Sequence, residues 1–412
     1  MSQPYHIGYI CMSCGELYPV DPFRYTCQTC GSNLDIAFEY ALIAAQWSQR
    51  ALEKNKNHSM WRYRPLLPVK GKPEEGVIPV GGTPLLQQKR LAQELGLRDL
   101  WLKDDTRNPS GSLKDRATDL AIQHAREEGY TTLVAASTGN AAASLACLSA
   151  ASGMEAVIFV PAEAPSAKLT QILQYGAHLF PVEGTYDDAY DLSLKVVADN
   201  DWYSRSTGMN PVLSEGKKTV ALEIAEQMNW VLPDYVFVPV GDGCIIGGVF
   251  KGFFDLHQLG WIERIPRIIA VQAKGSSAII NALEQEIINP VMADTIADSI
   301  SVAMPRDGLK ALRAVKESQG FGILVSDSEI LSAQHFLART TGLFAEPAAA
   351  TAFAGLLKAE STGRIGSNDS VAVLITGSGL KDISAAQKGI KFPKTISPTV
   401  TAFHKAWKQS HG

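Results

Sequence analysis

Apolar, β-rich runs alternate with helical stretches along this chain, and the alternation constrains the fold more than any other feature. The clearest runs are TTLVAAS (131–137), AVIFV (156–160), YVFVPV (235–240), RIIAVQA (267–273) and VAVLITG (371–377). Helices are expected before and between them, for example over 115–128 and 219–228. Strands that are apolar on both faces must be covered on both faces, so the pattern predicts an α/β fold with parallel sheets wrapped by helices. Ligands bind such sheets beyond the carboxyl ends of the strands.

The composition narrows the class of protein. The 412 residues allow two or three domains of roughly 150 residues each. With 46% hydrophobic residues the chain can bury a large core, and a net charge of −4 predicts no general attraction to nucleic acid or to a membrane surface. The first residues lack a basic segment followed by an apolar one, and no window holds the roughly 20 apolar residues that cross a bilayer. We therefore expect a cytoplasmic protein.

Four of the six cysteines form two CxxC pairs with twelve residues between the pairs: Cys11, Cys14, Cys27 and Cys30. A glycine follows each pair, at Gly15 and Gly31, and lets the chain turn so that two thiolates face one ion. Four thiolates suit a tetrahedral, structural zinc ion. The alternatives are a redox pair, which need not be duplicated, and disulfides, which a cytosolic chain would keep reduced. A nucleic-acid-binding ribbon is the other possible role, but the segment has only Arg24 as a cation.

The segment NPSGSLKDR (108–116) places Lys114 just after a Gly-Ser turn, at the expected start of a helix. Ser112 and Asp115 match the S-x-x-D capping box, which predicts that start. The positive end of a helix dipole disfavours an ammonium ion, so the pKa of Lys114 should be lowered, as a Schiff-base lysine requires. The alternative is an ordinary solvated lysine at a helix end, and on this segment alone that alternative is favoured.

Three more junctions follow predicted strands. In VAASTGN (134–140) the strand ends near Ser137 and a helix begins at Asn140, which suits a carboxylate ligand or an ordinary helix cap. The glycine turn of VPVGDGCIIGG (238–248) suits a phosphate. A dinucleotide site is the other reading, but the glycines are spaced G-x-G-x-x-x-G rather than G-x-G-x-x-G. In VAVLITGSG (371–379) the strand ends at the hydroxyl of Thr376.

Together the four junctions offer an amine, a carboxylate site, a phosphate site and a neutral hydroxyl. Pyridoxal phosphate needs this set, because it has an aldehyde, a phosphate and a ring nitrogen, and acts on amino acids. Here the chain resembles the fold type II (tryptophan synthase β-like) pyridoxal-phosphate enzymes, and more narrowly the threonine synthases, over almost its whole length. The matching motifs are the CxxC pairs, WRYRPLLP (61–68), GGTPL (81–85), NPSGSLKDR, ASTGNAAAS (136–144), NPVLSEGKKT (210–219), FAEPAAATAFAGL (344–356) and TGSGLKD (376–382).

The resemblance implies a role for each junction. Lys114 would carry the cofactor covalently and act as the catalytic base, and Thr376 would lie beside the ring nitrogen. Asn140 would contact both the cofactor and the substrate. The substrate carboxylate would be bound by Ser137, Thr138, Gly139 and Asn140, and the cofactor phosphate by Gly241, Asp242, Gly243, Cys244 and Ile245. The implied reaction converts O-phosphohomoserine and water into threonine and phosphate, and a homodimer is expected.

Some positions depart from the family pattern, and they lie where the substrate phosphate is expected. The family's arginine is Leu213 here, its Asn-Ser pair is Thr207-Gly208, and Asp242 replaces an asparagine. Arg107, Lys217 or Arg306 are candidates to compensate. The alternative is therefore a related enzyme performing β-elimination or β-replacement on serine, phosphoserine or another small amino acid, resembling cysteate synthases or dehydratases. A different class, a non-catalytic zinc-ribbon binding protein, is disfavoured by the intact lysine and loops.

The resemblance also implies a domain organisation. A zinc-knuckle segment would occupy residues 1–40. A large cofactor-binding domain would comprise 41–117 and 206–412, and a small mobile domain, 118–205, would be inserted in it. Because the small domain carries Asn140, its closure on the substrate would exclude water from the site.

Overall fold

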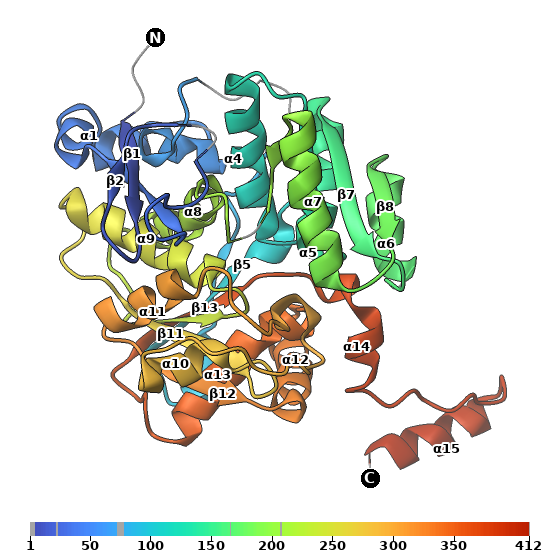
Figure 1. The fold of residues 1–412 in the computed structure, drawn as a ribbon. Helices are drawn as coiled ribbons and strands as arrows, with labels where there is room; N and C mark the ends of the chain where they lie inside the picture. Colours follow the sequence, from blue (N-terminus) through green and yellow to red (C-terminus); the bar gives the residue numbers. More distant parts are fainter. Residues whose placement is uncertain (1–4, 22–23, 72–77, 165, 207, 412) are drawn as a thin grey trace.

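The computed structural model describes residues 5–21, 24–71, 78–164, 166–206 and 208–411 (Figure 1). These residues form three sheets, of which two are large and wrapped by helices, so the predicted α/β fold class is confirmed. No helix in these ranges is long and apolar enough to cross a membrane.

The amino-terminal segment forms a small antiparallel sheet with the strand order β2-β1-β3, comprising β1 (His6–Cys11), β2 (Leu17–Tyr18) and β3 (Leu34–Phe38). Three short helices follow: α1 (Tyr40–Gln46), α2 (Gln49–Glu53) and η1 (Met60–Leu66). The Tyr40 hydroxyl donates to Asp255 Oδ1 at 2.6 Å, and the rings of Trp47 and Trp261 lie 4.5 Å apart. These contacts hold the segment against the body of the protein (Figure 1).

The largest sheet has six strands in the order β12-β11-β10-β13-β5-β4. Its strands are β4 (Leu85–Gln87), β5 (Asp99–Asp104), β10 (Tyr235–Pro239), β11 (Arg267–Ala273), β12 (Gly322–Val325) and β13 (Ser370–Ile375). All neighbours are parallel except β4, which pairs antiparallel with β5. The strands predicted from the runs at 235–240, 267–273 and 371–377 are therefore confirmed.

A second sheet has four parallel strands in the order β8-β7-β6-β9. They are β6 (Thr132–Ala136), β7 (Glu155–Pro161), β8 (His178–Val182) and β9 (Tyr203–Ser204). The runs at 131–137 and 156–160 form β6 and β7, as predicted. The sheet is built entirely from residues within 118–205, although movement of that part as a domain stays a prediction.

Helices cover both large sheets. Those between β4 and β12 are α3 (Lys89–Glu94), η2 (Asp105–Arg107), α4 (Lys114–Glu127), α5 (Asn140–Ser152), α6 (Ser166–Gln174), α7 (Tyr186–Asn200), α8 (Val212–Gln227), α9 (Cys244–Gln258), α10 (Ala278–Gln285), η3 (Asp298–Ile300) and α11 (Gly308–Glu317). The remainder are α12 (Asp327–Thr341), α13 (Pro347–Ser361), η4 (Gly379–Lys381), α14 (Ile383–Gln387) and α15 (Val400–His411). Helix α15 lies apart from the body (Figure 1).

Alternate residues of β10 show how the six-stranded sheet is buried. Val236 and Val238 belong to one apolar cluster with α8 and α9, whereas Phe237 belongs to a second cluster with α12 and α13. Side chains of a strand alternate between its faces, so both faces of this sheet are covered. The near-continuous apolar strands predicted this arrangement.

A buried ion cluster fixes α4, the helix that begins at Lys114. Arg116 is fully buried and donates to both carboxylate oxygens of Asp105, at 2.7 and 2.8 Å, and of Glu223, at 2.6 and 2.8 Å. Lys103 of β5 also donates to Glu223, at 2.6 Å. The cluster therefore joins the start of α4 to the end of β5 and to α8, and it sets where Lys114 lies.

Candidate active site

One cavity brings together four of the residues expected to bind the cofactor. Lys114, Asn140, Ile245 and Thr376 line it, with Leu113, Pro239, Ser299, Ile300, Glu346 and Ala348. Lys114 and Asn140 begin α4 and α5, Ile245 lies in the first turn of α9, and Thr376 follows β13. Three helix amino-termini and two strand ends thus meet in one place, as expected of a parallel α/β sheet.

Lys114 begins its helix as predicted, but the predicted capping box is wrong. The residue that caps α4 is Leu113, without a side-chain bond, and Ser112 Oγ has no partner among the described residues. The Asp115 carboxylate accepts instead from Ser110, from N at 2.7 Å and from Oγ at 2.5 Å. Asp115 therefore closes the turn before the helix, and the S-x-x-D spacing coincides with a different pair of bonds.

The pKa of Lys114 is lowered, in the direction expected of a nucleophilic lysine. Burial is the main cause, and the nearby Arg205 guanidinium lowers it further. Cys244, Glu346 and Asp242 act in the opposite direction. The sequence predicted the direction from the helix dipole, whereas burial in the cavity is the larger cause, since an ammonium ion loses its hydration there.

Glu346 is a cavity residue that the sequence did not indicate. Its buried carboxylate accepts from Asn140 Nδ2, at 2.8 Å to Oε1 and 3.0 Å to Oε2, and Ser299 Oγ lies 3.3 Å from the same nitrogen. Glu346 directly precedes Pro347, the first residue of α13. Burial raises the pKa of the Glu346 carboxyl, while the bond from Asn140 lowers it. The motif FAEPAAATAFAGL contains the residue, but nothing in that motif shows that it faces Asn140.

The glycine turn before α9 is shaped by close contact with the segment that ends at Asp307. Gly243 has a φ of +94°, and a Cβ there would lie 2.6 Å from Asp307 O, so only glycine fits. The Asp242 carboxylate accepts from Arg306 N at 3.2 Å, and burial raises its pKa. Asp242 is thus engaged with the backbone of its neighbour. The turn leaves the first N–H groups of α9 available to an anion such as phosphate.

The other residues predicted for the site differ in how they lie relative to the cavity. Ser137, Thr138 and Gly139 form the turn before Asn140, but they do not line the cavity, and Ser137 Oγ accepts from Gly139 N at 3.2 Å. Thr376 is buried, and its carbonyl accepts from Leu113 N at 2.8 Å, next to Lys114. Thr207 lies outside the described residues.

A larger cavity of about 1000 Å³ lies between η1 and α4, and none of the residues predicted for the site line it.

These donors fit pyridoxal phosphate. The cavity offers an amine of lowered pKa, a buried amide and a buried hydroxyl beside an open helix amino-terminus. Outside the residues that line this cavity, Lys217 is 1% exposed, and its ammonium has no hydrogen-bond partner among the described residues. A buried cation without a partner destabilises the folded protein unless an anion binds to it.

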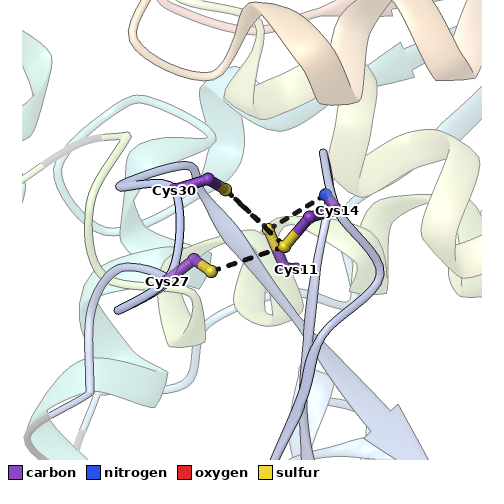
Figure 2. A group of neighbouring side chains, drawn as sticks. All are labelled: Cys11, Cys14, Cys27 and Cys30. Carbon is purple, nitrogen blue, oxygen red and sulfur yellow. Dashed lines mark hydrogen bonds between the residues drawn. The ribbon is translucent and has the colours of Figure 1, made fainter.

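The four amino-terminal cysteines form a second candidate site. Figure 2 shows their side chains pointing toward one another from two loops, with all four Sγ atoms within 4.8 Å of each other. The distances are 3.5 Å for Cys11–Cys30, and 3.7 Å for both Cys14–Cys27 and Cys14–Cys30. A tetrahedral zinc ion with bonds of about 2.3 Å separates its thiolates by about 3.8 Å. The cluster therefore has the dimensions that zinc requires.

Comparison with known families agrees with the chemistry of the cavity. A family model described as "Pyridoxal-phosphate dependent enzyme" matches residues 78–377, which include all four predicted cofactor-binding segments. The match covers most of the chain and defines the class of protein as a pyridoxal-phosphate-dependent enzyme.

Individual relatives narrow this class. The threonine synthase of Methanocaldococcus jannaschii is 37% identical over 403 residues, which are 97% of this chain and 99% of that protein. The threonine synthase of Methanosarcina acetivorans is 35% identical over 408 residues, 98% of each chain. A third, from Mycobacterium tuberculosis, is 36% identical over 337 residues, 82% of this chain and 91% of that one. The chain belongs to the threonine synthase family of pyridoxal-phosphate enzymes.

Solved structures support the same fold. A threonine deaminase from Solanum lycopersicum matches with a TM-score of 0.66 at 23% identity, over 74% of this chain and 86% of that one. Maize serine racemase matches with a TM-score of 0.65 at 21% identity, over 80% of this chain and 94% of that one. At such identities the similarity establishes the architecture and not the reaction.

Proposed function

We propose that this protein converts O-phosphohomoserine and water into threonine and phosphate with pyridoxal phosphate as its cofactor. The observation that carries the proposal is the convergence of Lys114, Asn140 and Thr376 in one cavity beside the amino-terminus of α9. Relatives that match this chain over nearly its whole length are threonine synthases. The substrate is thus a small amino acid that carries a phosphate on its side chain.

Each part of the cavity has a role in holding the cofactor. Lys114 would bind the aldehyde carbon, and Asn140 the hydroxyl on the ring. Thr376 would face the ring nitrogen, and the turn Gly241–Ile245 would bind the phosphate through backbone N–H groups. When bound, the cofactor supplies an electron sink for the carbanion that forms next to the amino group of the substrate.

The protein's own groups position the substrate and move its protons. Lys114, once released from the aldehyde carbon, would act as the mobile base at Cα, Cβ and the distal carbon. Its lowered pKa keeps a larger fraction of the amine neutral and able to accept a proton. The turn at 137–140 would orient the carboxylate of the substrate. Thr376 is uncharged and would not hold a full pyridinium as an acid would, which favours elimination and replacement over transamination.

The direct test compares the wild-type protein with Lys114→Ala and with Lys89→Ala, a substitution of an exposed lysine on α3. Wild type and Lys89→Ala should turn over O-phosphohomoserine at the same rate, and each should release one phosphate per threonine formed. Lys114→Ala should lose about 10²–10⁴-fold in kcat, because it lacks the proton-transfer group. It should also fail to form the covalent link that borohydride reduction and peptide mapping detect on the wild-type protein. A label on another residue would contradict the proposal.

The second candidate function is β-elimination or β-replacement on serine, phosphoserine or another small amino acid. It is favoured by Leu213, which is 1% exposed within an apolar core cluster, where the family pattern has an arginine. A leucine forms none of the bonds that an arginine makes with phosphate. Release of ammonia and pyruvate from serine or phosphoserine, without turnover of O-phosphohomoserine, would establish this function instead.

Four further proposals accompany the reaction. The four cysteines would hold one structural zinc ion, since no coordination position is left for water. The part from 118 to 205 would move as a small domain and close on the substrate, against a large domain of 41–117 and 206–412. The protein would act in the cytoplasm as a homodimer.

A further inference from the structure

Lys217 lies on α8 four residues, or about one helical turn, after Leu213, so the two side chains share a face of the helix. Both residues are 1% exposed. Leu213 packs in the apolar core, whereas the Lys217 ammonium has no hydrogen-bond partner among the described residues. Leaving a buried ammonium unpaired is costly for the folded protein. Its presence one turn from the missing arginine indicates a ligand.

The packing of α8 against α9 shows where the Lys217 side chain runs. A Cβ on Gly248 would lie 2.9 Å from Lys217 Cβ, and one on Gly252 would lie 2.5 Å from Lys218 O and 2.8 Å from Ala221 Cβ. The two helices therefore advance in the same direction. Side chains lean toward the amino-terminus of their own helix, so Lys217 extends toward the start of α9 and its glycine turn.

The charged groups that act on Lys217 are consistent with a side chain that extends toward the start of α9. The pKa of Lys217 is lowered to about 8, mainly by burial; the charges of Lys114 and Arg205 also lower it, whereas Cys244 and Asp307 raise it. Lys217 is therefore close enough to Lys114 to feel its charge. Arg205 is also buried and donates to Thr118 Oγ1 at 3.1 Å. Two further basic groups, Lys114 and Arg205, thus act on the Lys217 ammonium, and an anion bound by Lys217 would offset this mutual repulsion.

The other basic residues considered as substitutes for the arginine are differently placed. Arg306 pairs with Asp187 at 2.9 Å, and its guanidinium lies 3.8 Å from the centre of the Tyr190 ring. Arg107 is exposed on η2. Of the three candidates, Lys217 alone combines complete burial with an unpartnered charge near Lys114.

We propose that Lys217 binds the phosphate group of the amino-acid substrate and so replaces the arginine that is absent at Leu213. Phosphate oxygens of the cofactor offer the same chemistry. The glycine turn and the first N–H groups of α9 already supply donors for one phosphate, however, and Lys217 comes from a different helix. The inference rests on the proposed function, and it names the residue that selects a phosphorylated substrate.

The experiment compares Lys217→Met, Lys217→Arg and Lys195→Met, the last at an exposed position on α7, as holoenzymes. Three quantities are measured: kcat/KM for O-phosphohomoserine, the Kd for inorganic phosphate by calorimetry, and the Kd for pyridoxal phosphate from visible absorbance. Lys217→Met should lower kcat/KM and phosphate affinity by about 10- to 100-fold, mainly through KM, with the cofactor Kd changed less than about twofold. Lys217→Arg should retain part of both, and Lys195→Met should match wild type.

Other outcomes overturn the inference. Weaker cofactor binding by Lys217→Met with unchanged phosphate affinity would assign Lys217 to the cofactor, and three unchanged quantities would remove any role in binding. Methionine has a similar length and no charge, so the variant should fold, and Lys217→Arg provides a second folded variant. If the wild type does not turn over O-phosphohomoserine, the proposed function fails, but phosphate calorimetry still decides the role of Lys217.

Discussion

At the scale of single residues, the contact between Glu346 and Asn140 is the most informative feature of the site. A carboxylate buried in a cavity is stable only when it is paired or hydrogen-bonded, and here both of its oxygens accept from one amide. The bonds fix the direction in which the Asn140 amide faces. Glu346 is therefore a positioning residue for a group that would contact the cofactor.

Replacing Glu346 by glutamine tests this role. The Gln amide nitrogen cannot accept from Asn140, so one bond to the amide is lost and kcat should fall about tenfold or more, at about 1.4 kcal/mol per decade. The visible spectrum of the bound cofactor should also shift, because the reoriented Asn140 amide would contact the ring hydroxyl differently. Glu346→Asp should restore part of the kcat and part of the wild-type spectrum. Normal kcat and an unshifted spectrum in Glu346→Gln would show that Glu346 only fills space.

At the scale of elements, the amino-terminal sheet is attached to the body through charged contacts as well as through Tyr40. Asp35 of β3 pairs with Lys310 of α11 at 3.7 Å and lies 3.8 Å from Arg313. The Asn33 side chain donates to the carbonyl of Gly208, which lies shortly before α8. The sheet is small, so its stability should depend on the zinc ion proposed for the four cysteines.

Removing one cysteine tests that dependence. Cys14→Ser changes an exposed ligand and little packing, and Ser13→Ala in the same turn is the matched control. Cys14→Ser should lower the zinc content from about one ion per chain toward zero and produce an additional calorimetric transition at lower temperature, since metal binding and folding are coupled in such segments. The kcat of Cys14→Ser should fall by a smaller factor than its zinc content, because no cysteine of the cluster lines the candidate active-site cavity. Unchanged zinc content would contradict the assignment.

At the scale of the whole molecule, the ion cluster around Arg116 ties together parts of the chain that would otherwise pack only through apolar contacts. Arg116 and Lys103 lower the pKa of Glu223 far below its usual range, even though burial acts to raise it. A carboxyl with a lowered pKa in the folded state stabilises the protein above its unfolded pKa. That contribution is lost as the pH falls below about 4.5 toward the lower folded value.

Arg116→Met should therefore destabilise the protein strongly. It leaves Asp105 and part of the Glu223 charge buried without their partner, which typically costs about 3–5 kcal/mol. Urea unfolding followed by far-ultraviolet circular dichroism measures the loss, and Arg116→Lys should lose less because it keeps the charge. A change below about 1 kcal/mol in Arg116→Met would show that solvent or rearrangement compensates for the missing guanidinium.

Much of this organisation was predictable from the sequence because it is local. The strands at 131–137, 235–240 and 371–377 and the helix starts at Lys114 and Asn140 lie where they were expected. Apolar periodicity and turn residues act over a few neighbours, so they report these features directly. The capping box failed within the same range, because both Ser110 and Ser112 precede Asp115 by a few residues, and spacing alone does not show that Ser110 is the one that bonds to it.

By itself, then, the sequence determined where most strands and several helices lie, that they form a parallel α/β fold, and which four junctions contribute to the candidate site. The tertiary structure decided that Glu346 meets Asn140, 206 positions away, and that Lys217 is buried without a partner. The physical reason is that contacts between distant segments depend on which strands become neighbours in a sheet and how helices pack across it. No local pattern contains that information.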